Sequence, residues 1–135
     1  MHQTEFSRTP IIVGDADQER LMALAVGPAG DDLFAELARA ETIPSKALPL
    51  DVVRMGARVR FRTRGGGVRE VTLVYPDHAD IDRGRISVLT PIGTALLGLR
   101  AGQSIAWRTR DGRKDVLTVE EVGIPDDEAT DQRAG

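Results

Sequence analysis

Apolar and polar side chains alternate between residues 50 and 124 in the manner of half-buried β-strands. In "RVRFRTR", Val59 and Phe61 fall on one face of such a strand. A period of two predicts a strand with one buried side. The other face carries a row of arginines: Arg58, Arg60, Arg62 and Arg64.

The next stretch, "VREVTLVYP", predicts a returning strand after a turn at "GGG". Val71, Leu73 and Tyr75 are expected inward, whereas Glu70 and Thr72 are expected opposite the arginines. Side chains that lie directly opposite one another on two strands interact, so this register favours pairing of the acidic and basic positions.

A distinctive segment, "ISVLTPIGTALLGLRAGQSIAW", follows at residues 86–107. "RISVLT" predicts a third strand, and Thr90 is expected to cap a short helix with Pro91 at its first position, where the missing N–H costs nothing. Gly98 is expected to end the helix. The stretches "SIAWRTR" and "DVLTVEEV" predict a closing hairpin across Asp111 and Gly112.

Before residue 44, the apolar residues are spaced as in two short amphipathic helices. Asp15 is expected to cap a helix through about Val26, "GPAG" to break it, and Asp31 or Asp32 to cap a second helix to about Thr42. The short connection predicts an antiparallel hairpin. Four apolar side chains are expected to meet across it: Leu21, Leu24, Phe34 and Leu37.

These patterns predict an α+β chain in four parts. Residues 1–9 form a flexible N-terminus, and residues 10–46 a short antiparallel helical hairpin. Residues 47–124 form a domain of antiparallel β-sheet with one short helix, and residues 125–135 a flexible acidic tail.

Composition narrows the classes of function. The formal net charge of −3 argues against strong direct nucleic-acid binding. Cysteine is absent and there are only two histidines, which leaves no thiolate chemistry and too few histidines for a His-rich metal site. No apolar run approaches the ~20 residues of a membrane-spanning helix. We therefore expect a cytoplasmic protein that acts as a monomer, with no cofactor, no metal and no catalytic residue.

The 86–107 segment, together with "DVVRMGARVRFR" and "TLVYP", resembles the C-terminal domain of the Gre transcript-cleavage factors. It is more similar still to the bacterial nucleoside diphosphate kinase regulator family. The resemblance implies an FKBP-like domain that docks on RNA polymerase at the rim of the secondary channel, in competition with Gre factors. It also implies a short coiled coil, and a link to nucleoside diphosphate kinase levels that is direct or indirect.

The resemblance places the polymerase contact on five residues at the start of the short helix: Leu89, Thr90, Pro91, Ile92 and Gly93. Gre factors often carry an acidic residue two positions before the matching proline, where this chain has Leu89. The contact at that position is therefore expected to be more apolar than in Gre factors, or differently aimed.

Asp31 and Asp32 have two interpretations. At the tip of a Gre-type hairpin they would help to hold a catalytic magnesium, since carboxylates suit that ion. The alternative is helix capping. Helices of about twelve residues reach only about 18 Å, which favours capping and disfavours a transcript-cleavage factor.

The arginine row has two interpretations as well. It could bind RNA phosphates or an acidic polymerase surface, or it could be a solvated face paired with acidic neighbours. We favour the paired face.

A further alternative concerns the whole β-rich domain. FKBP-like domains include prolyl isomerases, and the scarcity of aromatic side chains argues against that activity here.

Overall fold

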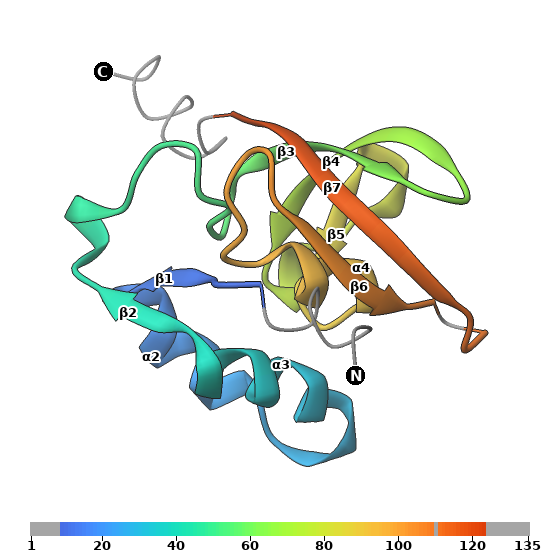
Figure 1. Cartoon of the computed structure of the whole chain (residues 1–135). Helices are drawn as coiled ribbons and strands as arrows, with labels where there is room; N and C mark the ends of the chain where they lie inside the picture. The colour runs from blue at the N-terminus through green and yellow to red at the C-terminus, as the bar shows by residue number, and fades with distance from the viewer. Residues whose placement is uncertain (1–8, 110, 124–135) are drawn as a thin grey trace.

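The computed structural model describes residues 9–109 and 111–123. Its main element is a curled five-stranded sheet with the strand order β5-β4-β3-β7-β6 (Figure 1). The strands are β3 (Arg58–Thr63), β4 (Gly67–Val74), β5 (Arg85–Ser87), β6 (Ser104–Arg108) and β7 (Lys114–Gly123). The mixed α+β class is confirmed. The ends expected to be flexible lie largely outside the described residues.

The prediction of an entirely antiparallel sheet is wrong for one pair of strands. β4 and β5 are parallel, with Leu73 paired to Ile86, and β5 ends at Ser87 instead of residue 90. The connection between these strands contains two 3₁₀ turns, η2 (Pro76–His78) and η3 (Ile81–Arg83). It lets the chain turn back past the last residues of β4, so β5 begins beside Thr72 and runs in the same direction as β4.

The alternation predicted for β3 is confirmed. Val59 and Phe61 are completely buried, and the arginines of the strand are exposed. Arg60 lies opposite Glu70, and Arg58 opposite Thr72, in the expected register. Because the pleat sends successive side chains to opposite faces, one strand builds both the core and a charged outer surface.

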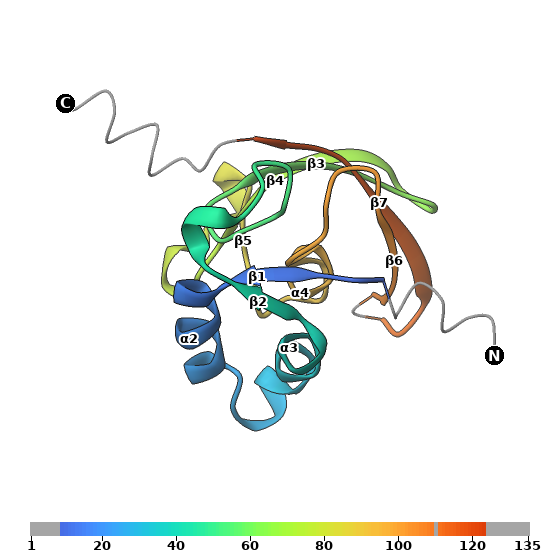
Figure 2. The same cartoon turned by 60° about the vertical axis from the view of Figure 1, so that its left-hand side comes forward.

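A short helix, α4 (Pro91–Leu96), covers part of the inner face of the sheet. Figure 2 shows this helix between the sheet and the N-terminal elements. Leu96 and Leu97 are buried, as expected, and they belong to one hydrophobic cluster with Phe61, Leu73 and Leu117. Thr90 caps the helix and Pro91 is its first residue, so that prediction is also confirmed.

The N-terminal part contains two helices that are joined by Ala25 and Val26, but their bounds differ from those expected. α2 (Asp15–Leu24) begins at Asp15, which is not its cap. α3 (Gly27–Arg39) begins within "GPAG", because a proline suits the first turn of a helix. Asp31 and Asp32 therefore lie beyond the first turn of α3, and neither caps it.

Two short strands frame these helices, and the sequence patterns did not predict them. β1 (Ile12–Gly14) and β2 (Glu41–Ile43) pair in parallel, followed by the 3₁₀ turn η1 (Ser45–Ala47). Asp15 accepts hydrogen bonds from the backbone N–H and hydroxyl of Ser45, each at 3.0 Å. Its carboxylate thus fixes the turn after β2 while its backbone begins α2.

The helices and the sheet share one core. Leu21, Leu33 and Leu37 are buried in the same cluster as the sheet residues. Phe34, in contrast, is 48% exposed, so the prediction that it packs across the helical pair is wrong. The buried stripe of α3 is carried by Leu33 and Leu37, four residues apart on one helix face.

Tyr75 connects α2 to the sheet. Its hydroxyl donates a hydrogen bond of 3.2 Å to Asp17, and the Arg20 guanidinium lies 4.5 Å from the ring centroid. Burial raises the pKa of the Tyr75 hydroxyl, and the negative charge of Asp17 raises it further, while Arg20 opposes the rise. The half-buried ring therefore anchors the helix through both its face and its edge.

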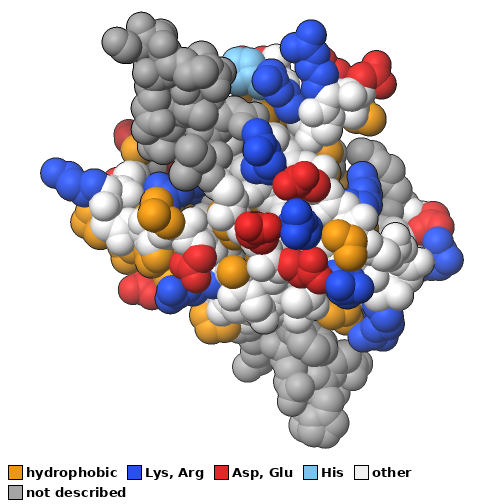
Figure 3. All heavy atoms as spheres, turned by 90° about the horizontal axis from the view of Figure 1, so that it is seen from above, with side chains coloured by type: hydrophobic (Ala, Val, Ile, Leu, Met, Phe, Trp, Pro, Cys, Tyr) orange, Lys and Arg blue, Asp and Glu red, His pale blue; other side chains and the backbone are white. Residues whose placement is uncertain are grey.

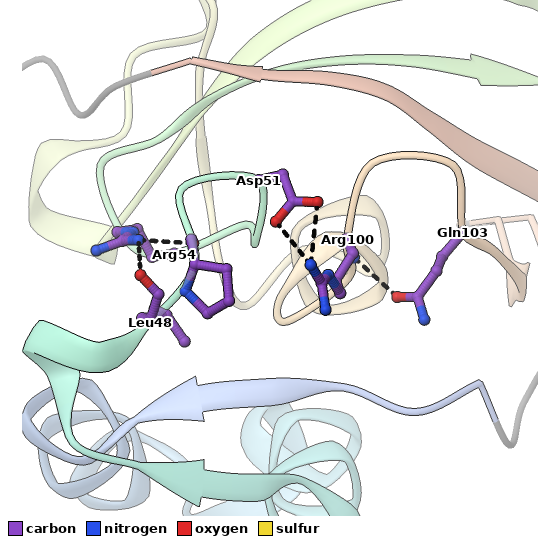
Figure 4. A network of polar contacts seen from close by, with 6 residues as sticks. Leu48, Asp51, Arg54, Arg100 and Gln103 are labelled. Carbon is purple, nitrogen blue, oxygen red and sulfur yellow. Dashed lines mark hydrogen bonds and ion pairs between the residues drawn. The ribbon is translucent and has the colours of Figure 1, made fainter.

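Side-chain and backbone contacts also hold the segment between β2 and β3, residues 44–57, which we call the strap (Figure 4). Arg54 donates hydrogen bonds to the carbonyls of Leu48 and Pro49, at 3.1 and 2.9 Å. Arg100 pairs with Asp51 at 3.3 Å. Backbone bonds between residues 51–53 and 98–101 join the same segments, so the strap is tied to the turn that follows α4.

We predict that Gly93→Ala destabilises the fold strongly. A Cβ at this position would lie 2.2 Å from the Ser87 carbonyl oxygen and 2.9 Å from the Val88 Cα, both backbone atoms. We expect the free energy of unfolding to fall by about 3 kcal/mol. Urea denaturation measures it, with Gly65→Ala as control, because that Cβ would meet only an Asp115 oxygen at 3.4 Å. Equal stability of the two variants would contradict the close approach.

We also predict that the single tyrosine titrates above its ordinary pKa of about 10. An absorbance titration of the native chain measures this directly, because Tyr75 is the only tyrosine. Since folding raises this pKa, the contribution to stability is complete below about pH 10 and is lost as the pH rises further. Asp17→Asn should lower the midpoint. A native midpoint equal to that of the urea-unfolded chain would contradict the contact.

Candidate docking surface

The 89–93 segment is held rigidly at the start of α4. The Thr90 hydroxyl accepts a hydrogen bond from the Gly93 N–H at 3.0 Å and donates one to the Ser87 carbonyl at 2.7 Å. The Leu89 N–H donates to the Ser87 hydroxyl at 3.0 Å. These bonds satisfy polar groups on both sides of the turn, so the segment has one defined shape.

Exposure within the 89–93 segment is lower than an open contact loop would have. Leu89, Thr90, Pro91 and Ile92 are half-buried, and Leu89 and Ile92 pack partly against the core. Gly93 is buried, which means that it supports the segment and presents no side chain. The accessible surface of the segment is therefore the outer side of four residues.

A hollow of about 400 Å³ adjoins this segment. Pro91 and Ile92 form one side of it, and Trp107 comes from β6. Ile86 contributes from β5, and Ile81 contributes from η3 with 83% of its surface exposed. The sequence patterns did not assign these three residues to a site; the isolated Ile81 within a polar loop was the available indication.

A second hollow of about 630 Å³ shares Arg69, Ile92 and Trp107 with the first. Its other walls include Arg64, Arg113 and Lys114, at the end of the β3–β4 and β6–β7 hairpins. We call the two adjoining hollows the Trp107 hollow. It has an apolar half beside α4 and a basic half beside the hairpin turns.

The arginine row lies on the opposite, outer face of β3, except for Arg64, which follows the end of the strand. Arg62 pairs with Glu120 at 2.8 Å and Arg60 with Glu121 at 3.3 Å, so β7 supplies the partners. Figure 3 shows basic and acidic side chains interleaved over this face. The geometry favours the paired, solvated interpretation of the row, which leaves little free charge to attract phosphate.

Asp31 and Asp32 do not lie at the end of the helical pair. The connection there is formed by Ala25 and Val26, and Val26 is 68% exposed. Asp32 instead lines a small groove between α3, α4 and β6 that also includes Pro91. Within the described residues, no cluster of three or more His, Cys, Asp or Glu side chains could hold a metal ion.

A membrane-crossing helix would need far more apolar length than α2, α3 or α4 provides. None of the helices in residues 9–109 and 111–123 meets that requirement.

Comparison with known proteins shows which family this chain is similar to. Residues 48–123 match the C-terminal domain of the transcription elongation factors GreA and GreB. The chain is 42% identical over 132 residues to the regulator of nucleoside diphosphate kinase of Escherichia coli strain K12. That alignment covers 93% of this chain and 97% of that protein, and thus extends through the helices.

Two further relatives show how much of this chain is similar to GreA/GreB factors. GreA of Thermodesulfovibrio yellowstonii is 37% identical over 75 residues, which cover 55% of this chain and 48% of that protein. A GreA/GreB transcription elongation factor structure from Nitrosomonas europaea is 39% identical, with a TM-score of 0.67, covering 85% of this chain and 98% of the other. The chain belongs to the nucleoside diphosphate kinase regulator family, which is related to the GreA/GreB factors through their C-terminal domain.

Proposed function

We propose that this protein is a non-catalytic regulator that binds RNA polymerase near the secondary channel and competes there with Gre-type factors. The 89–93 segment is the proposed contact. The observation that carries this proposal is the rigid, half-exposed start of α4 beside an apolar hollow, in a chain of this family. Binding of this kind would act on nucleoside diphosphate kinase levels through transcription.

The dimensions of the helices support binding without transcript cleavage. α2 has 10 residues and α3 has 13. At a rise of ~1.5 Å per residue, these helices extend only about 15 and 20 Å. Asp31 and Asp32 lie on the side of α3, back from its N-terminal end, and are poorly placed to deliver a carboxylate to a distant active site.

The domain is also proposed to be FKBP-like without being a prolyl isomerase. Trp107 is the only aromatic side chain that lines either half of the Trp107 hollow. Phe61 lies beneath, completely buried. An isomerase pocket needs several accessible aromatic walls, so the hollow is better suited to holding a partner side chain.

We predict that Pro91→Glu weakens polymerase binding while the fold remains intact. Glutamate is favourable in the first turn of a helix, so stability should change by less than about 1 kcal/mol. The new charge would lie in the middle of the proposed contact. A competition assay with GreA on core polymerase, together with a thermal melt, measures both effects.

The matched control is Leu96→Ala, which removes a completely buried side chain. It should cost about 2–5 kcal/mol of stability and leave competition unchanged at temperatures where the variant is folded. If Pro91→Glu competes as well as the wild-type chain, the contact lies elsewhere.

We further predict that the protein does not stimulate transcript cleavage. Added to a backtracked elongation complex at physiological magnesium, it should leave the RNA 3′ end intact, because the short helices would leave Asp31 and Asp32 far from the active site. GreA provides the positive control. Cleavage that disappears in Asp31→Asn/Asp32→Asn would restore the catalytic alternative.

A further inference from the structure

The Trp107 hollow carries positive charge that the rest of the chain does not balance. Arg64, Arg69, Arg85 and Lys114 line its two halves. Within the described residues, none of these four side chains forms an ion pair with a carboxylate. The chain as a whole carries a net charge of −3, so this is a local concentration of charge opposite in sign to the average.

The nearby carboxylates form no ion pair with these four cations, although Asp115 itself lines the basic half and offsets part of its charge. Asp115 accepts hydrogen bonds from the backbone N–H groups of Arg64 and Val116, at 3.1 and 2.6 Å. Asp80 pairs with Arg83 at 3.6 Å. The outer face of β3, where arginines are paired with glutamates of β7, shows that this sheet can neutralise arginines when acidic residues occupy neighbouring strands.

The centre of the hollow is apolar. Trp107 and Ile92 are half-buried and belong to both halves. Ile81 stands 83% exposed at the outer edge, so its side chain adds to the apolar surface that a partner could contact. The guanidinium of Arg69 lies 5.9 Å from the centroid of the buried Phe61 ring, which orients this arginine over the inner face of the sheet.

We propose that the Trp107 hollow binds an acidic protein segment whose central apolar side chain packs against Trp107 and Ile92. Apolar burial would supply affinity, and the ring of unpaired cations would supply orientation and a faster association. This inference rests on the proposed function and deepens it, because it gives the chemistry of the polymerase segment that faces the 89–93 segment.

A protein segment fits this surface better than a single-stranded nucleic acid. Nucleic-acid strands bind through several aromatic rings on which successive bases stack, and Trp107 is the only accessible ring of the hollow. Its indole nitrogen is buried, which leaves only part of the ring for contact. The negative charge of the chain as a whole would also repel the phosphates of a longer strand.

Trp107 provides the measurement, because it is the only tryptophan of the chain. The probe is a 12-residue synthetic peptide, about 40 Å when extended, of mixed Asp and Glu with one central Leu. We expect its addition to shift the emission of Trp107 in a saturable manner, and the affinity to fall steeply as salt is raised. A peptide with Lys at the acidic positions, and one with Ser in place of Leu, should give no saturable shift.

The test variant is Arg69→Glu/Lys114→Glu, since both side chains are exposed and neither belongs to the buried core. We expect it to bind the acidic peptide and core polymerase at least about tenfold more weakly. The matched control is Arg60→Glu/Arg62→Glu, which makes the same change of charge on the paired outer face. We expect it to bind within about twofold of the wild-type chain, with thermal melts confirming that both variants are folded.

The outcomes separate this inference from the proposed function. If the peptide gives no saturable shift, or if the two double variants bind equally, the inference is overturned, and polymerase binding by the wild-type chain still supports the function. If the peptide binds but polymerase does not, the function fails and the surface chemistry stands. If a single-stranded oligonucleotide shifts the emission and Arg69→Glu/Lys114→Glu abolishes that shift, the hollow is a nucleic-acid site and the inference is overturned.

Discussion

The close approach of α4 to the end of β5 is the constraint on which the structure depends. Gly93 allows it, since any Cβ there would collide with the Ser87 carbonyl. With the backbones in contact, the Thr90 side chain reaches both the Gly93 N–H and the Ser87 carbonyl, which fixes the turn. A six-residue helix has too few internal hydrogen bonds to be stable alone, so its position comes from this packing.

The same constraint shapes the surface. Because α4 is short and held close to β5, it covers the inner face of the sheet only in part. Phe61 and Leu73 are sealed beneath it, whereas Trp107 and Ile92 remain half-exposed beside it. The proposed docking surface is thus formed by side chains that pack against the core but that α4 leaves partly exposed.

Charge is distributed differently on the two faces of the sheet. On the outer face, β3 and β7 bring arginines and glutamates together, and exposed pairs of this kind contribute little to stability but leave the face nearly neutral. Around the hollow, Arg69 of β4 and Arg85 of β5 form no ion pair with a carboxylate within the described residues. A predominantly basic region beside an apolar centre is a property of binding surfaces more than of folding.

The sequence by itself determined the features that depend on neighbours along the chain. The alternation around Phe61, the cap at Thr90, the proline at the first helical position and the hairpin at Gly112 follow from local backbone preferences, and the structure has them. The tertiary structure alone decided the parallel β1–β2 and β4–β5 pairs, the place of Asp32 beside Pro91, and the joining of Arg69, Ile81 and Trp107 around one hollow. These features depend on contacts between segments that are distant in the sequence. The free energy of such contacts is set by how the segments pack together, so no local pattern of residues predicts it.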